Sequence, residues 1–217
     1  MFMQLLGQDG MNFEFQVFRV LDQEFPDSVH ACDGWLITGS KFAAYGPEPW
    51  IPALKVFIQG IVAADLPLVG ICFGHQIIAE ALGGRVEKSE KGWGLGFDTY
   101  RLDRELAASQ PEQITLNIFH QDQVIDLPAG ARVYASSDFC ENAGMFIGDR
   151  IMTIQGHPEI KVDYNRHLLA ARRDTVGPPK RVDQAMEELE QGEQTTDSEC
   201  FGQWMGQFFN DSARDVY

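Results

Sequence analysis

The chain has 217 residues, of which 44% are hydrophobic and 23% are charged, a balance typical of a soluble globular protein. Its formal net charge of −15 makes binding to phosphate backbones unfavourable, and no apolar run approaches the roughly 20 residues that cross a bilayer. These properties argue against nucleic-acid partners and membrane spans, and the length fits one domain over residues 1–217.

The cysteines are too far apart and too irregularly spaced to indicate a structural zinc site, and no C-x-x-C pair is present. Met1–Gly10 shows no basic residue before its apolar part and no secretory pattern. We therefore expect a reducing cytoplasm and free thiols, most of which are usually small core residues. The thiols are Cys32, Cys72, Cys140 and Cys200.

The first part of the chain alternates strand-like and helix-like patterns. Short apolar runs predict strands, and apolar residues at i, i+3 and i+4 spacing predict helices. Gly39-Ser40 opens a loop after one strand, and Gly83-Gly84 closes a helix. We predict strands at 13–20, 33–38 and 67–72 and helices at 50–64 and 75–82.

The middle of the chain consists of short strand-like pieces between turn residues, which indicates a sheet with hairpins at one edge. Helical patterns return toward the C-terminus, and the last carries an apolar stripe typical of core packing. The order predicts an α/β fold with a mostly parallel central sheet. We predict strands at 94–102, 114–119, 131–136, 144–148 and 150–154 and helices at 162–172, 182–189 and 201–209.

One cysteine lies in a setting suited to nucleophilic chemistry. Gly70 and Gly74 flank Cys72 in a G-x-C-x-G pattern between a buried strand and a helix. With serine, this layout is the nucleophile elbow, in which glycines avoid collisions at a tight turn. The N-terminus of the following helix carries a partial positive charge that favours the thiolate. A buried, unreactive thiol in the same turn is the alternative interpretation.

A cysteine nucleophile usually needs a histidine that accepts its proton and later protonates the leaving amine. Among five histidines, His157 stands out because Pro158 stiffens its loop and Glu159 follows two residues later. A carboxylate there can hold the imidazole tautomer and stabilise the imidazolium. We expect His75 to point away from Cys72, and the pattern leaves the role of His120 open.

Taken together, these stretches resemble the class I glutamine amidotransferases, specifically stand-alone members similar to the glutaminase domain of GMP synthetase. Gly70–Gln76 is similar to the nucleophile motif of that family, and Gln155–Glu159 is similar to its histidine–glutamate motif. The segments 33–40, 91–94 and 120–124 also fall in the family's order. The resemblance implies a three-layer, flavodoxin-like fold whose central sheet is flanked by helices.

The resemblance also implies roles for residues. Cys72, His157 and Glu159 form the catalytic triad, and the backbone N–H groups of Gly39 and Phe73 form the oxyanion hole. Substrate contacts come from Gln76, Gln121 and Asp122. The substrate is glutamine or another small γ-glutamyl compound, and no metal or organic cofactor is needed.

The chain departs from the family pattern in three ways. It begins inside the first helix, at Met1–Leu6, so the usual first strand of the sheet is expected to be missing. The oxyanion loop reads Thr38-Gly39-Ser40 and keeps the glycine that supplies the donor. The chain carries no synthetase domain and no phosphate-binding glycine-rich loop.

These features leave several functions open. The chain could hydrolyse glutamine and deliver ammonia to a separate synthetase protein, or it could be a stand-alone γ-glutamyl peptide hydrolase. A catalytically silent binding or regulatory module on the same fold is a third reading, against which an intact triad argues. The related chaperone and deglycase group usually has histidine directly after the nucleophile, where this chain has Phe73.

Overall fold

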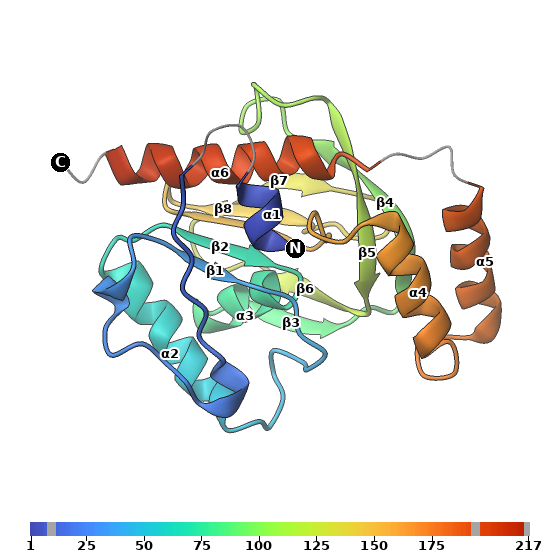
Figure 1. Cartoon of the computed structure of the whole chain (residues 1–217), viewed down its shortest axis with the longest axis horizontal. Coiled ribbons are helices and arrows are strands. Elements are labelled where there is room, and N and C mark those ends of the chain that lie inside the picture. Colours follow the sequence, from blue (N-terminus) through green and yellow to red (C-terminus); the bar gives the residue numbers. More distant parts are fainter. Residues whose placement is uncertain (8–11, 192–195, 215–217) are drawn as a thin grey trace.

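The computed structural model describes residues 1–7, 12–191 and 196–214. A seven-stranded sheet in the order β1-β2-β9-β8-β7-β4-β5 forms the centre (Figure 1). Its strands are β1 (Trp35–Ile37), β2 (Leu68–Ile71), β4 (Gly94–Leu102), β5 (Gln113–His120), β7 (Ala131–Ser136), β8 (Gly144–Ile147) and β9 (Ile151–Ile154). A separate pair consists of β3 (Arg85–Lys88) and β6 (Asp122–Asp126).

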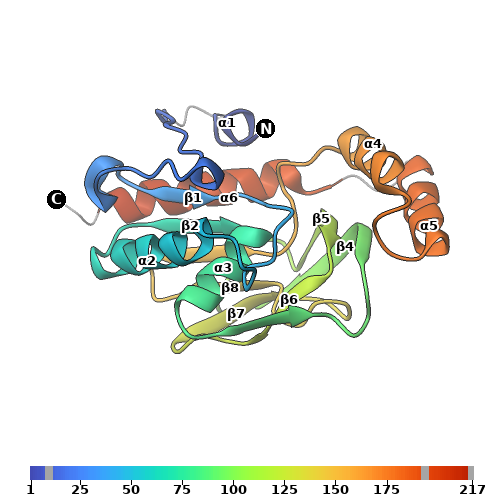
Figure 2. The same ribbon diagram turned by 90° about the horizontal axis from the view of Figure 1, so that it is seen from below.

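Helices cover both faces of this sheet, as expected for an α/β fold. The helices α2 (Trp50–Ala63) and α3 (Phe73–Ala81) lie on one side of β1 and β2, and α6 (Ser198–Arg214) lies on the other, with α1 (Phe2–Leu6) packed against it (Figure 2). The helices α4 (Val162–Arg172) and α5 (Pro179–Glu190) pack beside β4. No helix in the described part of the chain is long and apolar enough to cross a membrane.

The sheet is mixed, so the expectation of a mostly parallel sheet is wrong. Only β1, β2 and β9 run parallel, and the other four neighbouring pairs are antiparallel. The reason is connection length, because parallel neighbours need a crossover of a dozen or more residues. The strands β7, β8 and β9 follow one another through short loops, and such hairpins force antiparallel pairing.

The predicted strand at 13–20 is also wrong. The segment has no partner strand among the described residues and ends in a short 3₁₀ helix, Val20–Asp22. Its aromatic residues pack instead, since the ring centroids of Phe13 and Phe209 lie 6.1 Å apart and those of Phe18 and Trp35 lie 5.8 Å apart. The alternation therefore reflects contacts to other elements rather than sheet pairing. No strand precedes β1 in the described segments.

Side-chain alternation along β2 connects the two main hydrophobic clusters. Val69 and Ile71 pack toward the cluster under α1 and α6, whereas Leu68 packs toward α2 and α3. All four residues of β2 are buried, so this strand is fixed from both faces. The residue that follows β2 is consequently held at a well-defined place at the carboxyl edge of the sheet.

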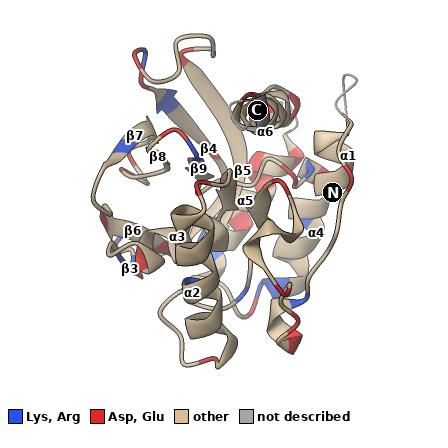
Figure 3. Cartoon of the chain, turned by 90° about the vertical axis from the view of Figure 1, so that its left-hand side faces the viewer, with Lys and Arg blue, Asp and Glu red and all other residues tan. Residues whose placement is uncertain are grey.

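Basic residues are spread over the molecule. Lys and Arg occur on β3, β7 and α4, interspersed with Asp and Glu, rather than along one element (Figure 3). A nucleic-acid-binding surface gathers its basic residues on one face. The scattered basic residues therefore argue against such a surface, as the net negative charge does.

Candidate functional site

Three predicted site residues follow three neighbouring parallel strands. Gly39 comes shortly after β1, Cys72 directly after β2, and His157 shortly after β9. The carboxyl ends of neighbouring parallel strands meet at one edge of a sheet, where ligand sites in α/β folds usually form. The strand order β1-β2-β9 therefore places Cys72 between the other two residues.

Cys72 occupies a strained turn between β2 and α3. Its φ of 53° and ψ of −101° lie far from helix or strand values, and such a conformation costs on the order of 1–3 kcal/mol. The flanking glycines make the turn sterically feasible. A Cβ on Gly74 would lie 2.1 Å from the carbonyl oxygen of Ile37, and one on Gly70 would lie 2.7 Å from the backbone of Gly74. The strand–turn–helix arrangement predicted around Cys72 is thus present.

His157 is held on both sides of its ring. Its Nδ1 lies 2.8 Å from Oε1 of Glu159, and the imidazole also interacts with the side chain of Cys72. Because Nδ1 is engaged by the carboxylate, Nε2 is the ring nitrogen that is left to interact with Cys72. The structure brings together the three residues that the sequence proposed, although 85 positions (157 − 72) separate the cysteine from the histidine.

Electrostatics favour a charged imidazole at this place. Burial lowers the pKa of His157, but the negative charges of Cys72 and Glu159 and the hydrogen bonds to both residues raise it by more. The pKa of His157 consequently lies well above the ordinary value for imidazole. Such an arrangement supports a thiolate–imidazolium pair, which is the reactive form of a cysteine nucleophile.

The two proposed oxyanion donors belong to residues that adjoin Cys72 in space or in sequence. A Cβ on Gly39 would be 2.9 Å from Cε1 of His157 and 3.9 Å from Cβ of Cys72, so only glycine fits there. Phe73 is the first residue of α3, where the backbone N–H has no partner within the helix. Its ring turns into the core and packs 5.5 Å from the ring of Trp50.

The proposed substrate residues differ in their surroundings. Nε2 of Gln76 donates to the backbone oxygen of Asp122 at 2.8 Å and to Oε1 of Gln155 at 3.1 Å. Asp122 is half-buried, and burial raises the pKa of its carboxyl group, against a hydrogen bond from Tyr45. The backbone oxygen of Gln121 instead accepts from the N–H of Ser89 at 2.9 Å, so this contact lies outside the cluster.

Sequence reasoning missed a role for Gln155. Its buried amide donates through Nε2 to Sγ of Cys72 at 3.6 Å, while its Oε1 accepts from Gln76. The contacts with Gln76 and Asp122 thus form a hydrogen-bonded path that ends at the sulfur. The signal was present, because Gln155 opens the same short motif as His157, but only the fold shows where its side chain points.

The other buried histidines are neutral at physiological pH. Burial lowers the pKa of His75 to about 3, and its Nδ1 lies 2.8 Å from Oγ1 of Thr153 on β9. The expectation that His75 points away from Cys72 agrees with this contact. Burial, together with the charge of His157, also lowers the pKa of His120 to about 4.

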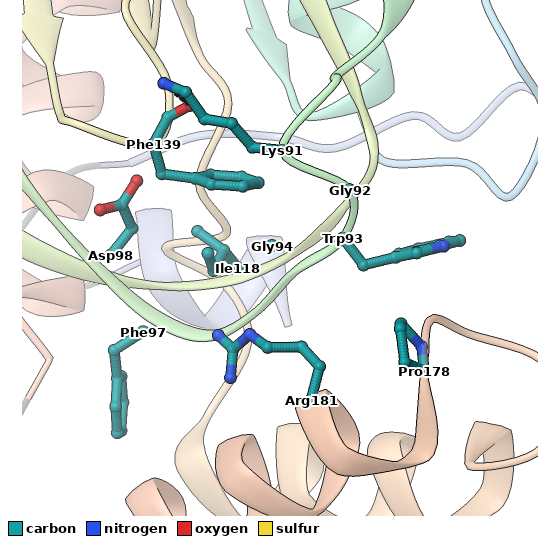
Figure 4. A pocket seen from close by; sticks show the side chains of 10 residues that line it. All are labelled: Lys91, Gly92, Trp93, Gly94, Phe97, Asp98, Ile118, Phe139, Pro178 and Arg181. Atoms are coloured by element: carbon teal, nitrogen blue, oxygen red, sulfur yellow. Dashed lines mark hydrogen bonds between the residues drawn. The ribbon is translucent and has the colours of Figure 1, made fainter.

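A pocket of about 360 Å³ lies beside the start of β4, where one of its walls is the loop 91–94 (Figure 4). Arg181 of α5 and Pro178, which directly precedes that helix, face the loop across the pocket, and Phe139 and Ile118 add apolar surface. Neither Cys72 nor His157 lines it, so the pocket is a neighbouring cavity rather than the site of the proposed chemistry.

Comparisons with known proteins agree with this geometry. The family model for glutamine amidotransferase class-I matches residues 11–172. The chain is 34% identical over 194 residues to γ-glutamyl peptidase 3 of Arabidopsis thaliana, which covers 84% of this chain and 75% of that protein.

Two further matches bear on partner and fold. The chain is 36% identical over 101 residues to a glutamine-hydrolysing GMP synthase subunit of Archaeoglobus fulgidus, covering 44% of this chain and 54% of that protein. A crystal structure of a glutamine amidotransferase from Methylobacillus flagellatus superposes with a TM-score of 0.76 over 98% of this chain and 88% of that one. At 21% identity, this likeness concerns the fold alone.

Proposed function

Because this chain belongs to the class I glutamine amidotransferase family, we propose that it hydrolyses γ-glutamyl amide bonds through a thioester on Cys72. One observation carries the proposal. Nδ1 of His157 lies 2.8 Å from a carboxylate oxygen of Glu159 in the same loop, and the imidazole interacts with the side chain of Cys72, which comes from a separate segment at the same sheet edge. That arrangement fits a nucleophile, a proton carrier and an orienting carboxylate.

The reaction follows from these positions. The Cys72 thiolate attacks the amide carbon of the γ-glutamyl group and forms a tetrahedral oxyanion. The imidazolium of His157 gives its proton to the leaving nitrogen, the C–N bond breaks, and the amine departs. Neutral His157 then takes a proton from water, which attacks the thioester and releases the carboxylate and the thiolate. Glu159 holds the imidazole in one tautomer throughout.

We assign the oxyanion hole to the backbone N–H groups of Gly39 and Phe73. Both residues lie beside the sulfur, and the N-terminus of α3 adds a partial positive charge where the oxyanion forms. Losing one such donor typically lowers the rate by about 10²–10³-fold. This assignment also accounts for the steric requirement for glycine at position 39.

We assign recognition of the γ-glutamyl end to Gln76, Gln121 and Asp122. Gln76 and Asp122 are already joined by a hydrogen bond, and Gln155 connects them to Cys72. The half-buried carboxylate of Asp122 suits an ammonium group such as the α-amino group of a γ-glutamyl compound. The substrate is then a small molecule.

Two activities share this chemistry. The relation to γ-glutamyl peptidase 3 extends over 84% of the chain, whereas the match to the GMP synthase protein covers 44%. We therefore place hydrolysis of γ-glutamyl peptides by the isolated chain first. Hydrolysis of glutamine for a separate synthetase subunit is the second candidate, which the GMP synthase match favours. The four free thiols fit a reducing compartment such as the cytoplasm.

A substrate screen separates these readings. Glutamine, glutathione and several γ-glutamyl peptides are incubated with the isolated chain, and ammonia, glutamate and released amine are measured separately. If the chain turns over γ-glutamyl peptides but not glutamine, the result supports the peptidase. If it turns over glutamine but not the peptides, the result supports a glutaminase that serves a separate synthetase.

The matched control for this screen is Cys72→Ala, which should abolish hydrolysis at a nearly unchanged melting temperature. No turnover of any γ-glutamyl compound by the folded wild type would contradict the proposal. So would a Cys72→Ala variant that keeps more than about a hundredth of the rate, since removal of such a nucleophile costs far more.

A further inference from the structure

A buried pair of asparagines lies behind the loop that carries His157 and Glu159. Asn117 belongs to β5, Asn165 belongs to α4, and both are fully buried. Nδ2 of Asn165 donates to Oδ1 of Asn117 at 2.8 Å and to the backbone oxygen of Gly96 at 3.1 Å. One side chain of α4 thus binds both strands of the β4–β5 hairpin, beside which α4 lies (Figure 1).

Asn117 in turn fixes both ends of the catalytic loop. Its backbone oxygen accepts from the N–H of His157 at 2.8 Å, in a single antiparallel bridge outside the regular strands. Its side-chain Nδ2 donates to the backbone oxygen of Ile160 at 2.7 Å. The segment between these two bonds contains His157, Pro158 and Glu159, so one residue clamps the stretch that holds two members of the proposed triad.

Asn165 determines which way the Asn117 amide points. The carbonyl of Gly96 can only accept, so it requires the N–H side of the Asn165 amide. The second N–H of that amide then faces Asn117 and requires an acceptor, which places Oδ1 of Asn117 there. Only in this orientation does Nδ2 of Asn117 reach the oxygen of Ile160.

The cluster retains buried polar atoms that no group in the described part of the chain satisfies. Oδ1 of Asn165 and Oε2 of Glu159 are buried without a hydrogen-bond partner among the described residues. Buried acceptors of this kind oppose folding, and an apolar side chain at position 165 of α4 would avoid the one on Asn165. Their presence beside the histidine–glutamate loop is better explained by positioning than by stability.

We propose that Asn165, acting through Asn117, is a positioning residue that holds His157 and Glu159 in register with Cys72. The proposal rests on the triad assigned above. It gives a role in the chemistry to α4, a helix that carries neither Cys72 nor His157. Loosening the clamp lets the imidazole drift from the thiolate while leaving the proposed γ-glutamyl contacts at Gln76 and Asp122 intact.

The test compares Asn165→Leu with Leu169→Ala. Leu169 is fully buried one turn further along α4 and packs in the apolar cluster with α5, so its truncation measures what loosening α4 alone does. Asn165→Asp is the second variant, since it keeps the shape of the side chain and removes the donors. Melting temperatures are recorded so that variants of similar stability are compared.

For Asn165→Leu, kcat should fall about 10–100-fold, by analogy with the loss of an outer hydrogen-bond partner of a metal-ligating histidine. KM should stay within about twofold, because the substrate contacts are untouched. The pH midpoint for alkylation of Cys72 by iodoacetamide should move upward, because the imidazolium no longer stays beside the sulfur. Leu169→Ala should lower the melting temperature and leave kcat and that midpoint unchanged.

The alkylation measurement needs no substrate, so it separates this proposal from the assignment of the reaction. A shifted midpoint in Asn165→Leu supports the clamp even if the wild type hydrolyses none of the γ-glutamyl compounds. The proposal is overturned if the kcat and alkylation profile of Asn165→Leu match those of Leu169→Ala. It is equally overturned if KM rises while kcat stays at the wild-type value, or if Asn165→Asp behaves as the wild type.

Discussion

Oε1 of Glu159 lies 2.8 Å from Nδ1 of His157, although only one residue separates them along the chain. The intervening Pro158 restricts the backbone, and the bond from the N–H of His157 to Asn117 fixes the start of the segment. A carboxylate held this close selects the tautomer in which Nε2 serves the sulfur. The local chain path thus brings together the proposed base and its proposed orienting partner.

We expect Glu159→Gln to slow hydrolysis less than His157→Ala does. In the proposed mechanism the carboxylate orients and stabilises the imidazolium, whereas the imidazole itself transfers the protons. Steady-state kinetics on one γ-glutamyl substrate measure both variants, with melting temperatures to exclude misfolding. An equal loss of kcat from the two substitutions would contradict this division of roles.

We expect Gln155→Leu to lower kcat by about tenfold, because the amide that donates to the sulfur is lost and a charge-assisted hydrogen bond contributes about 1.5–3 kcal/mol. Gln123→Leu is the matched control. Gln123 is also buried, and its Nε2 donates to the backbone oxygen of Phe139 at 3.1 Å, away from the sulfur. Similar rates for the two variants would show that the sulfur contact has no kinetic role.

Gly74→Ala should destabilise the fold strongly. The added methyl group would lie 2.1 Å from the oxygen of Ile37, so β1 or α3 must move, at a cost at or above the upper end of the about 1–3 kcal/mol typical of overpacking. Gly60→Ala in α2 is the control, since its methyl group meets only a side-chain carbon of Val29, at 3.2 Å. Urea unfolding measures both, and comparable free energies of unfolding would contradict the steric account of the turn.

The chain should lose stability as the pH falls from 7 to 5. The pKa values of His75 and His120 in the folded protein are lowered to about 3 and about 4. In the unfolded chain a histidine has a pKa of about 6.5, so these side chains bind protons in the unfolded state at a higher pH than in the folded state. Each histidine then costs about 2 kcal/mol at pH 5. His157 does not add to this loss, because its pKa is raised and its contribution persists in acid.

Melting temperatures at pH 7 and pH 5 measure this effect. His75→Asn removes one titrating group and should flatten the pH dependence. His30→Asn, at an exposed position, should leave it as in the wild type. An unchanged pH dependence in His75→Asn would mean that His75 titrates in the folded protein much as it does in the unfolded chain.

The proposed catalytic constellation could be predicted because its signals are local. Gly70, Cys72 and Gly74 follow a buried strand within a few residues, and His157 and Glu159 share one short motif. The contact between Gln155 and the sulfur was not predictable, since it depends on side-chain direction after folding. The bond between Asn117 and Asn165 joins residues 48 positions apart and depends on how α4 packs against β5.

The errors in the sheet have equally physical causes. A strand needs a partner, and the apolar alternation at 13–20 carries no information about whether one is available. β3 was missed because three of its four residues are exposed and three are charged, which hides the alternation. Sheet direction depends on loop length, and the short connections around β8 were the signal for antiparallel pairing.

The central claim is a γ-glutamyl thioester on Cys72, and rapid quenching in acid followed by mass spectrometry tests it most directly. The wild type, mixed with a γ-glutamyl peptide that it turns over, should gain the mass of one γ-glutamyl group. Peptide mapping should locate that mass on Cys72, and hydroxylamine should remove it. Attachment of the group to another residue, or turnover of the peptide by Cys72→Ala at the wild-type rate, would contradict the account.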